Sequence, residues 1–361
     1  MGAKSDIEWT GASWTPIRAR NLRTRKIGWY CEHATTGCEF CYAEDLNKWV
    51  GTGFAFKPGH RKDVEIFLDE EMLLAPLRWK KPRKIFMCSM TDAFAEFVKD
   101  EWLDKMFAVM ALCPQHTFQV LTKRAERMRA YLAAPYRHDE IGHQMIELGD
   151  IQPGFKCVTW PLPNIWLGIS CERQQEADER IPLLLQTPAA VRFISAEPLL
   201  APIDLTELYP DRKSENAVHA LAGIRANPDD TASFGPGLNW VIVGGESGPH
   251  ARPMEARWAT SIRDQCAASG VAFFFKQWGE YLPVDQSLPG CGKVHGATAV
   301  KPGRMRLHYG GTPQQAPKHA FIERGVEFAS TADGRLTFRV GKKAAGRLLD
   351  GREHNDMPGR V

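Results

Sequence analysis

Short apolar segments alternate with amphipathic segments along most of the chain. Apolar segments rich in β-branched and aromatic residues predict buried strands at residues 84–90, 116–122, 164–170, 190–198, 239–248 and 271–279. Segments with apolar residues at helical spacing lie between several of them, at residues 100–113, 123–132, 174–186 and 255–270. Apolar strands separated by helix-length segments are typical of a parallel sheet covered by helices. The pattern therefore predicts an α/β fold with parallel strands.

Three segments interrupt this alternation. Residues 132–162, 203–237 and 281–340 are richer in Pro, Gly and polar residues, and we interpret them as insertions or lids. We therefore expect one parallel-sheet unit over residues 1–280, with insertions at 132–162 and 203–237. A C-terminal extension or lid follows over residues 281–361.

Nearly every predicted strand ends on small and ionisable residues. These residues include Ser89, Asp92, Lys123, Ser170, Glu172, Glu197, Gly244, Gly245, Glu246 and Lys276. The carboxyl ends of parallel strands meet at one face of a sheet, where active sites are commonly built, so we predict one shared site. The alternative is that Ser, Thr and Asp cap the helices that follow. Capping does not explain Lys123, Glu197, Glu246 and Lys276.

Three of these charged positions allow more specific expectations. Glu246 and Lys123 could equally form a buried structural ion pair instead of serving catalysis. Lys276 directly follows three phenylalanines, and an ammonium group in that position needs a carboxylate or a phosphate partner. His250 and Arg252, which come shortly after Glu246, lie in a Gly- and Pro-containing loop that would either bind an anion or simply be solvated.

Composition and charge narrow the class of protein only slightly. The chain has 361 residues, of which 43% are hydrophobic and 25% charged, with a formal net charge of +3. No apolar segment approaches the roughly 20 residues that span a bilayer, so we expect a soluble, cytoplasmic protein without a membrane partner. The nine cysteines are odd in number and mostly scattered, which favours reduced thiols over a disulfide framework.

Three cysteines form the densest chemical signal in the chain. Cys31, Cys38 and Cys41 follow a C-x6-C-x2-C spacing, with a glycine just before the second cysteine. A structural zinc site would need a fourth ligand, for which His33 or Cys88 is available. Packing of the thiols without any metal is a second alternative. A four-iron cluster held by three thiolates would leave one iron open to another ligand.

The sequence GCEFCYAE, with an aromatic residue just before the last cysteine, resembles the end of the radical S-adenosylmethionine signature. That superfamily has a partial (β/α)6 TIM-like barrel, with the three cysteines on the loop after the first strand, and the resemblance implies this fold here. The spacing departs from the superfamily's usual C-x3-C-x2-C. A closer resemblance covers nearly the whole chain and is to an uncharacterised phage-associated three-cysteine family. The segments that carry it include DIEWTGASWTP, LTKRAERM, ISAEPLL, VIVGGESGPHARPM, FFFKQWGE and GRLLDGREHNDMP.

The resemblance to radical S-adenosylmethionine enzymes implies cofactors and residue roles. Cys31, Cys38 and Cys41 would bind three irons of a [4Fe-4S] cluster, and S-adenosylmethionine would occupy the fourth. Cleavage of its sulfonium would give a 5′-deoxyadenosyl radical that removes hydrogen from a substrate. Around the cofactor, the implied contacts are Tyr42 for adenine, Ser89 and Asp92 for the methionyl ammonium, Ser170 and Glu172 for the ribose, and Lys123 for the methionyl carboxylate. The superfamily's Gly-Gly-Glu role does not carry over to Gly244, Gly245 and Glu246, which come four strands later, but these glycines would allow close backbone approach to a ligand at the mouth of the barrel.

Two hypotheses about function follow. The first is a radical S-adenosylmethionine-like enzyme that acts on a nucleotide, nucleic-acid or protein substrate with the help of a reductant protein. Its catalytic candidates are Lys123, Glu197, Glu246 and Lys276. The alternative is a non-enzymatic, zinc-stabilised protein that binds nucleic acid or another partner. We expect the terminal segment to fold back over the mouth of the barrel and to place four polar residues there: Arg347, Asp350, Arg352 and His354.

Overall fold

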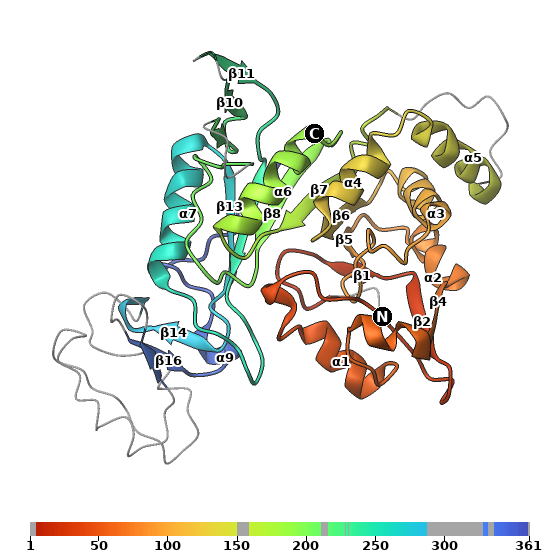
Figure 1. The fold of residues 1–361 in the computed structure, drawn as a ribbon, viewed down its shortest axis with the longest axis horizontal. Helices are drawn as coiled ribbons and strands as arrows, with labels where there is room; N and C mark the ends of the chain where they lie inside the picture. The colour runs from red at the N-terminus through yellow and green to blue at the C-terminus, as the bar shows by residue number, and fades with distance from the viewer. Residues whose placement is uncertain are drawn as a thin grey trace.

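The computed structural model describes residues 5–149, 159–210, 216–227, 229, 231–286, 328–330 and 336–359. In this part of the chain, seven parallel strands form one sheet in the order β1, β5, β6, β7, β8, β12 and β13. Their bounds are Ala12–Trp14, Lys84–Met87, Thr117–Thr122, Ile165–Ser170, Val191–Ala196, Trp240–Gly244 and Ala272–Gln277. The sheet curls into a half-barrel flanked by helices (Figure 1). The predicted partial barrel of parallel strands is therefore confirmed.

Four helices join successive strands of the sheet where helical periodicity predicts them. They are α3 (Asp100–Ala111), α4 (Ala125–Leu132), α6 (Gln174–Gln186) and α7 (Ala256–Ser269). All six predicted strands are present as β5, β6, β7, β8, β12 and β13. The additional strand, β1, has only three residues, and a segment that short carries too few positions for a periodic pattern.

The two faces of the sheet carry different side chains because successive strand residues point to opposite sides. One face packs against the helices with aliphatic residues such as Leu167 and Val243. On the concave face, Trp9 packs with the aromatic residues Trp166, Phe193, Trp240 and Phe274. These rings fill the lower part of the half-barrel and form the floor beneath the strand ends.

One glycine of the concave face makes room for this floor. Gly168 in β7 lies opposite Phe193 in β8. A Cβ atom at this glycine would come within 2.5 Å of the Phe193 ring. The absence of a side chain on one strand therefore allows the large ring on the next strand to lie across it.

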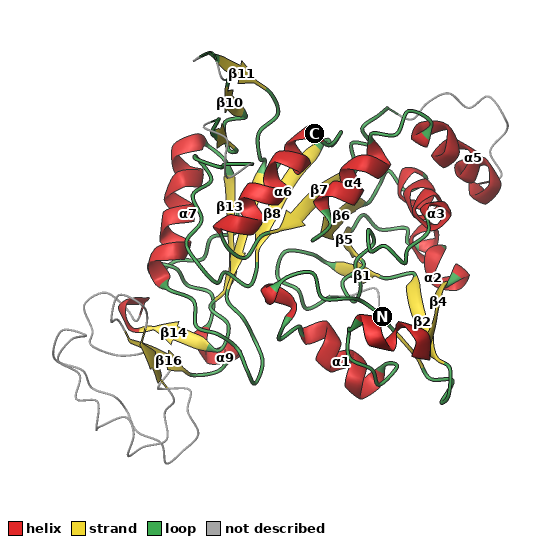
Figure 2. Ribbon diagram, in the orientation of Figure 1, coloured by secondary structure: helices red, strands yellow, loops and turns green. Residues whose placement is uncertain are grey.

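A second, smaller sheet lies between β1 and β5 in the chain. Its antiparallel strands follow the order β3 (Ile27–Gly28), β2 (Ile17–Asn21) and β4 (Val64–Leu68). The helices α1 (Tyr42–Val50) and α2 (Glu70–Leu73) belong to the same part of the chain (Figure 2). The three clustered cysteines lie between β3 and the first turn of α1.

The predicted insertions contain structure of their own. The first contains α5 (Arg137–Gly149), whose Arg137 guanidinium contacts Asp104 at 2.6 Å and Asp100 at 2.8 Å on α3. The second contains an antiparallel sheet of β9 (Val218–His219), β10 (Ile224–Ala226) and β11 (Ala232–Phe234). Residues 150–158 and 211–215, within these insertions, lie outside the described residues.

The described part of the C-terminal extension forms a third small sheet. Its strands are β14 (Tyr281–Pro283), β16 (Leu336–Arg339) and β15 (Phe328–Ser330), and the short helix α9 (Lys342–Ala345) follows. Most of the predicted lid, residues 287–327, lies outside the described residues. No helix of the described residues has the length and apolar character needed to cross a membrane.

The terminal segment differs from the expectation that it covers the mouth of the barrel. The Phe275 amide donates to the carbonyl of His354 at 3.0 Å, and the Asp356 amide donates to Phe273 at 3.2 Å. The segment therefore pairs with the free edge of β13. Trp240, the first residue of β12, donates its indole N–H to Asp356 at 2.8 Å, which places the end of this segment near the opposite, lower end of the strands. The four polar residues expected over the mouth are not among those lining it: Arg347, Asp350, Arg352 and His354.

Candidate functional site

The carboxyl ends of the parallel strands surround one cavity of about 420 Å³. Its walls come from the cysteine loop, from the ends of β5, β6, β7, β8, β12 and β13, and from the N-terminal segment. Most of the predicted site residues line it: Cys31, Cys38, Cys41, Tyr42, Ser89, Asp92, Lys123, Ser170, Glu197, Gly245, Glu246 and Lys276. Two predicted residues, Glu172 and Gly244, are not part of this lining and lie behind it.

The three clustered cysteines face this cavity together. Cys38 ends a short 3-10 turn (Thr36–Cys38), and Cys41 is the N-cap residue of α1. Cys38 is buried, and Cys31 and Cys41 are half-buried. The strand-to-helix turn thus places three thiols at the mouth of the half-barrel.

Backbone amides surround two of these sulfur atoms. Cys38 Sγ accepts a hydrogen bond from the Ala34 amide at 3.4 Å. Burial raises the pKa of Cys41, and the amides of Glu44 and Ala43 at the start of α1 act in the opposite direction. Burial also raises the pKa of Cys31 to about 12. The free thiols of Cys31 and Cys41 are therefore protonated at neutral pH, although N–H groups at the start of α1 are already in place to stabilise the Cys41 thiolate.

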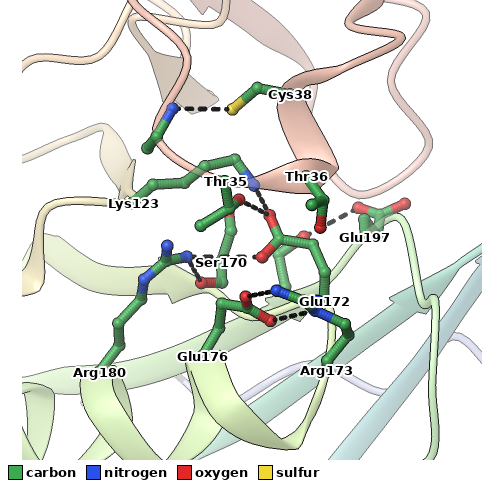
Figure 3. Close-up of polar contacts among 12 residues, drawn as sticks. Thr35, Thr36, Cys38, Lys123, Ser170, Glu172, Arg173, Glu176, Arg180 and Glu197 are labelled. Atoms are coloured by element: carbon green, nitrogen blue, oxygen red, sulfur yellow. Dashed lines mark hydrogen bonds and ion pairs between the residues drawn. The ribbon is translucent and has the colours of Figure 1, made fainter.

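A buried carboxylate supports the cysteine loop from below. Glu172, after β7, is fully buried and forms ion pairs with Lys123 and with Arg180, the latter at 3.5 Å. Thr35 Oγ1 donates to the same carboxylate at 3.3 Å, and Figure 3 shows all three side chains pointing toward it. A Cβ atom at Gly37 would lie 2.4 Å from Glu172 Oε1. The loop therefore rests directly on this carboxylate, which requires glycine at the point of contact.

A second support comes from the ends of β5 and β6. Arg124 donates to the carbonyl of Glu32, next to the first cysteine, at 2.9 Å. The same guanidinium pairs with Asp92 at 2.9 Å. Asp92 also accepts from Thr122 Oγ1 at 2.7 Å and from the Lys123 amide at 3.0 Å. The oxygens of this buried carboxylate are thus already engaged, so Asp92 positions the loop and is not a free acceptor for an ammonium group.

A third support comes from the loop after β12. Arg252 binds Glu246 through two nitrogens, at 2.7 and 2.8 Å. Its guanidinium also donates to the carbonyl of Thr36 at 3.0 Å and pairs with Glu39 at 3.3 Å. It lies 5.1 Å from the centre of the Phe40 ring. Arg252 therefore clamps the cysteine loop and is not available as the anion-binding residue that its loop suggested.

The alternative of an ion pair between Glu246 and Lys123 is wrong. Lys123 pairs with Glu172, and Glu246 pairs with Arg252. Both predicted residues line the cavity, but each one is held by a partner that contacts the cysteine loop. The pairing differs because strands that are far apart in the chain decide which charges meet.

The opposite wall carries a different ion pair. Lys276, at the end of β13, lies 3.1 Å from Glu197 Oε1, and Ser195 Oγ donates to Glu197 Oε2 at 3.0 Å. The carboxylate partner expected for Lys276 is therefore present. Both charged side chains keep some exposure to the cavity, 18% for Lys276 and 13% for Glu197.

The two adjacent glycines at the end of β12 make room for protein neighbours. A Cβ atom at Gly244 would lie 2.3 Å from Glu197 Oε1, and one at Gly245 would lie 2.0 Å from the carbonyl oxygen of Trp278. Close approach was expected for a ligand at both positions. Instead, the Glu197 side chain lies against Gly244, and the backbone of Trp278, just after β13, lies against Gly245.

Tyr42 and Ser89 connect the cysteine loop to the end of β5. The Tyr42 hydroxyl donates to the carbonyl of Ser89 at 2.9 Å. The tyrosine side chain is 54% exposed and lines the cavity. Its ring therefore forms part of the rim, where a planar group of a ligand would pass.

Several residues of the site were not identified from the sequence. Arg124 and Thr35 hold the cysteine loop, and Arg180 pairs with Glu172 beneath it. Lys342 in α9 lines the cavity while pairing with Glu8 at 3.4 Å. Arg124 directly follows Lys123 at the end of a predicted strand, which was a usable signal. Lys342 carried none, because the C-terminal extension returns to the mouth only through tertiary structure.

The fit of a metal centre depends on how the donor atoms are arranged. Among the residues that the structure describes, no group of three His, Cys, Asp or Glu side chains is arranged to hold a single metal ion. His33, a proposed fourth zinc ligand, hydrogen-bonds Glu44 at 2.8 Å and does not line the cavity. A four-iron cluster makes a different demand, because each of three thiolates binds a separate iron. Cys88, the other proposed fourth zinc ligand, does line the cavity. Cys31, Cys38 and Cys41 offer the number and kind of donors that a cluster would need.

The fold and the site together define an α/β half-barrel protein with a cysteine-lined cavity at the carboxyl ends of its strands. The chain belongs to the family described as protein of unknown function (DUF5131), whose model matches residues 4–358. No curated protein and no solved structure matches the chain.

Proposed function

We propose that this protein is a radical S-adenosylmethionine-like iron–sulfur enzyme. One observation carries the proposal: Cys31, Cys38 and Cys41 all line one cavity at the carboxyl ends of a parallel half-barrel. Reactions in parallel barrels take place at that end. Three thiolates of one loop would hold three irons of a [4Fe-4S] cluster and leave the fourth iron open for a second cofactor. Cys88, directly after β5, lines the same cavity. When bound, cluster and S-adenosylmethionine together would supply a 5′-deoxyadenosyl radical.

The protein residues around this centre would have three separate tasks. Glu172 and Arg252 hold the loop that carries the thiols by direct contacts, and Asp92 holds it through Arg124. Tyr42 contributes a planar surface at the rim for a base or another flat group. Lys276 and Glu197, paired but still open to the cavity, are the groups placed to bind or to exchange a proton with a substrate.

The size of the cavity restricts how a substrate is presented. About 420 Å³ suits a single ligand of nucleoside size. With S-adenosylmethionine inside, only a protruding group of the substrate would enter. We therefore keep a nucleotide, nucleic acid or protein as the proposed substrate class. The reduced cysteines and the oxygen sensitivity of such clusters favour the cytoplasm as its location.

The test is chemical analysis of protein that is purified and reconstituted without oxygen. Wild-type protein should bind about four irons and four sulfides, and each of Cys31→Ala, Cys38→Ala and Cys41→Ala should lose them. Cys266→Ala is the matched control, because that residue lies on the buried face of α7 and does not line the cavity. With dithionite, the loaded protein should convert S-adenosylmethionine into 5′-deoxyadenosine, measured by mass spectrometry.

The outcomes separate the proposal from its alternative. One tightly bound zinc ion without sulfide would end the radical hypothesis and support a structural zinc site. Loss of the metal centre in the Cys266→Ala control as well would show a general folding defect. Iron and sulfide lost only in the three loop variants would support the cluster.

A further inference from the structure

An apolar surface covers the exposed side of α1 and the adjacent hairpin. Four α1 residues at helical spacing are exposed, with exposed fractions of 84% for Trp49, 55% for Val50, 54% for Tyr42 at the rim of the cavity, and 40% for Leu46. Ile27, in the hairpin between β2 and β3, is 43% exposed. Surface tryptophans exposed to this degree, grouped with aliphatic side chains, mark sites where another molecule binds.

The hairpin is joined directly to the end of α1. Lys26 Nζ donates to the carbonyl of Trp49 at 3.2 Å. The amide of Trp29, just after β3, donates to Asn47 Oδ1 on α1 at 2.9 Å. A Cβ atom at Gly28 would lie 2.6 Å from the same oxygen. The hairpin and α1 therefore form one continuous surface, which we call the α1–hairpin surface: Leu22–Ile27 with Tyr42, Leu46, Trp49 and Val50.

The edge of the α1–hairpin surface is positively charged. Arg23, Arg25 and Lys26 are all exposed. Neither Arg23 nor Arg25 has a side-chain hydrogen bond or an ion pair with any residue that the structure describes. Arg20, on the adjacent strand, is instead neutralised by Glu65 at 2.7 Å. An apolar centre with Trp and Tyr and an unneutralised basic edge is complementary to a protein with an acidic rim.

The surface begins at the cysteine loop. Cys41 caps α1, and Tyr42 is the first residue of the helix. At 1.5 Å per residue, the helix carries Trp49 about 12 Å from Cys41. A protein bound on this surface would therefore be close to whatever the three thiols hold.

We propose that the α1–hairpin surface docks a small acidic electron-carrier protein. This inference rests on the proposed function, because reductive cleavage of S-adenosylmethionine consumes one electron that the chain itself does not supply. The carrier would give up one electron, which a cluster held by the three thiols would take up and pass to the sulfonium. The bond between sulfur and C5′ would then break and give methionine and the 5′-deoxyadenosyl radical. Aliphatic side chains around Trp49 favour a protein partner over stacked bases, which need flat aromatic surfaces.

The test compares two reductants on the same loaded protein. The probes are dithionite, which needs no docking, and an acidic flavodoxin kept reduced by its NADPH-dependent reductase. Arg23→Glu/Arg25→Glu and Trp49→Ala should each lower the flavodoxin-driven rate about tenfold and leave the dithionite-driven rate and the iron content unchanged. Lys80→Glu/Lys81→Glu is the matched control, since it reverses two exposed charges before β5, at the opposite end of the strands.

Direct binding gives a readout that does not depend on turnover. The flavodoxin should bind the wild-type protein with a dissociation constant that rises with salt and is about tenfold higher in the charge-reversal variant. Equal binding by wild type and variant would overturn the proposal, as would equal losses with both reductants. Loss of binding of a single-stranded oligonucleotide, but not of flavodoxin, would assign the surface to nucleic acid. Wild-type protein without iron and sulfide would instead refute the proposed function, and the docking inference with it.

Discussion

The two walls of the cavity use their charged residues in opposite ways. On the cysteine side, Glu172, Asp92 and Arg252 are tied to other protein groups and to the loop itself. On the side of β8 and β13, Lys276 and Glu197 pair, among the described residues, only with each other and with one serine, and both remain partly open to the cavity. A charged residue at a strand end therefore does not reveal its role. The partners of the side chain reveal it. A charged group whose hydrogen-bonding capacity is filled by protein groups positions a neighbour, whereas a charged group with free capacity can act on a ligand.

Removal of the buried carboxylate should cause the largest change on the cysteine side. Glu172→Gln leaves Lys123 and Arg180 without their shared counter-charge, and we expect a loss of about 3 kcal/mol in the free energy of unfolding. Chemical denaturation would measure this loss, and iron content after reconstitution should fall with it. The control is Glu65→Gln, because the Glu65 side chain is 48% exposed. This substitution should lower the free energy of unfolding by about 0.5 kcal/mol or less. Equal effects in the two variants would contradict the supporting role of Glu172.

A single methyl group at the contact of the loop with Glu172 should have the next largest effect. Gly37→Ala places Cβ against the Glu172 carboxylate, so either the loop or the carboxylate must shift, at a cost of about 1–3 kcal/mol. Thermal unfolding would detect the change. Gly59→Ala is the control, because a Cβ atom there meets nothing within 4 Å. A melting temperature unchanged by Gly37→Ala would show that the loop does not rest on Glu172.

Substitutions in the opposite wall should lower the activity of the protein and leave its stability nearly unchanged. Glu197→Gln/Lys276→Met removes both charges together, so no unpaired ion is left behind, and stability should change by about 1 kcal/mol or less. If the pair binds or exchanges a proton with a substrate, turnover of that substrate should fall about 100-fold. Iron content should stay at the wild-type level. A stability loss as large as that of Glu172→Gln would remove the distinction between the two walls.

Acidification should produce the smallest of these effects, and it should act through the terminal segment. Burial lowers the pKa of His354, whose backbone pairs with β13 behind the open wall. Because the folded protein holds this histidine neutral, the unfolded chain binds more protons below about pH 6.5. Stability is therefore lost as the pH falls through and below that value. The melting temperature of His354→Gln should drop less between neutral and mildly acidic pH than that of the wild type, and equal drops would contradict this assignment.

The periodic pattern predicted the main elements well. Strands such as β7 and β8 lie within the predicted segments, and α6 covers the predicted residues 174–186. Such segments are long enough for burial on both faces of the sheet to leave a clear signal. The strand β1 was missed because its three residues are too few to leave such a signal. The terminal segment was misplaced because its polar residues do not specify which backbone edge they accompany.

The sequence by itself determined the parallel helix-covered sheet and the gathering of polar strand ends at one face, because both follow from local order along the chain. The position of the three cysteines at that face was implied only by the resemblance to radical S-adenosylmethionine enzymes. Only the tertiary structure decided the pairings: Lys123 with Glu172, Glu246 with Arg252, and Lys276 with Glu197. A charged side chain at a strand end has several neighbours within reach. Which one it meets depends on strand order, on the curl of the sheet and on the space left by glycines such as Gly37 and Gly244. Those are properties of the folded chain, and they separate the residues that hold the cysteine loop from the residues left to act in the cavity.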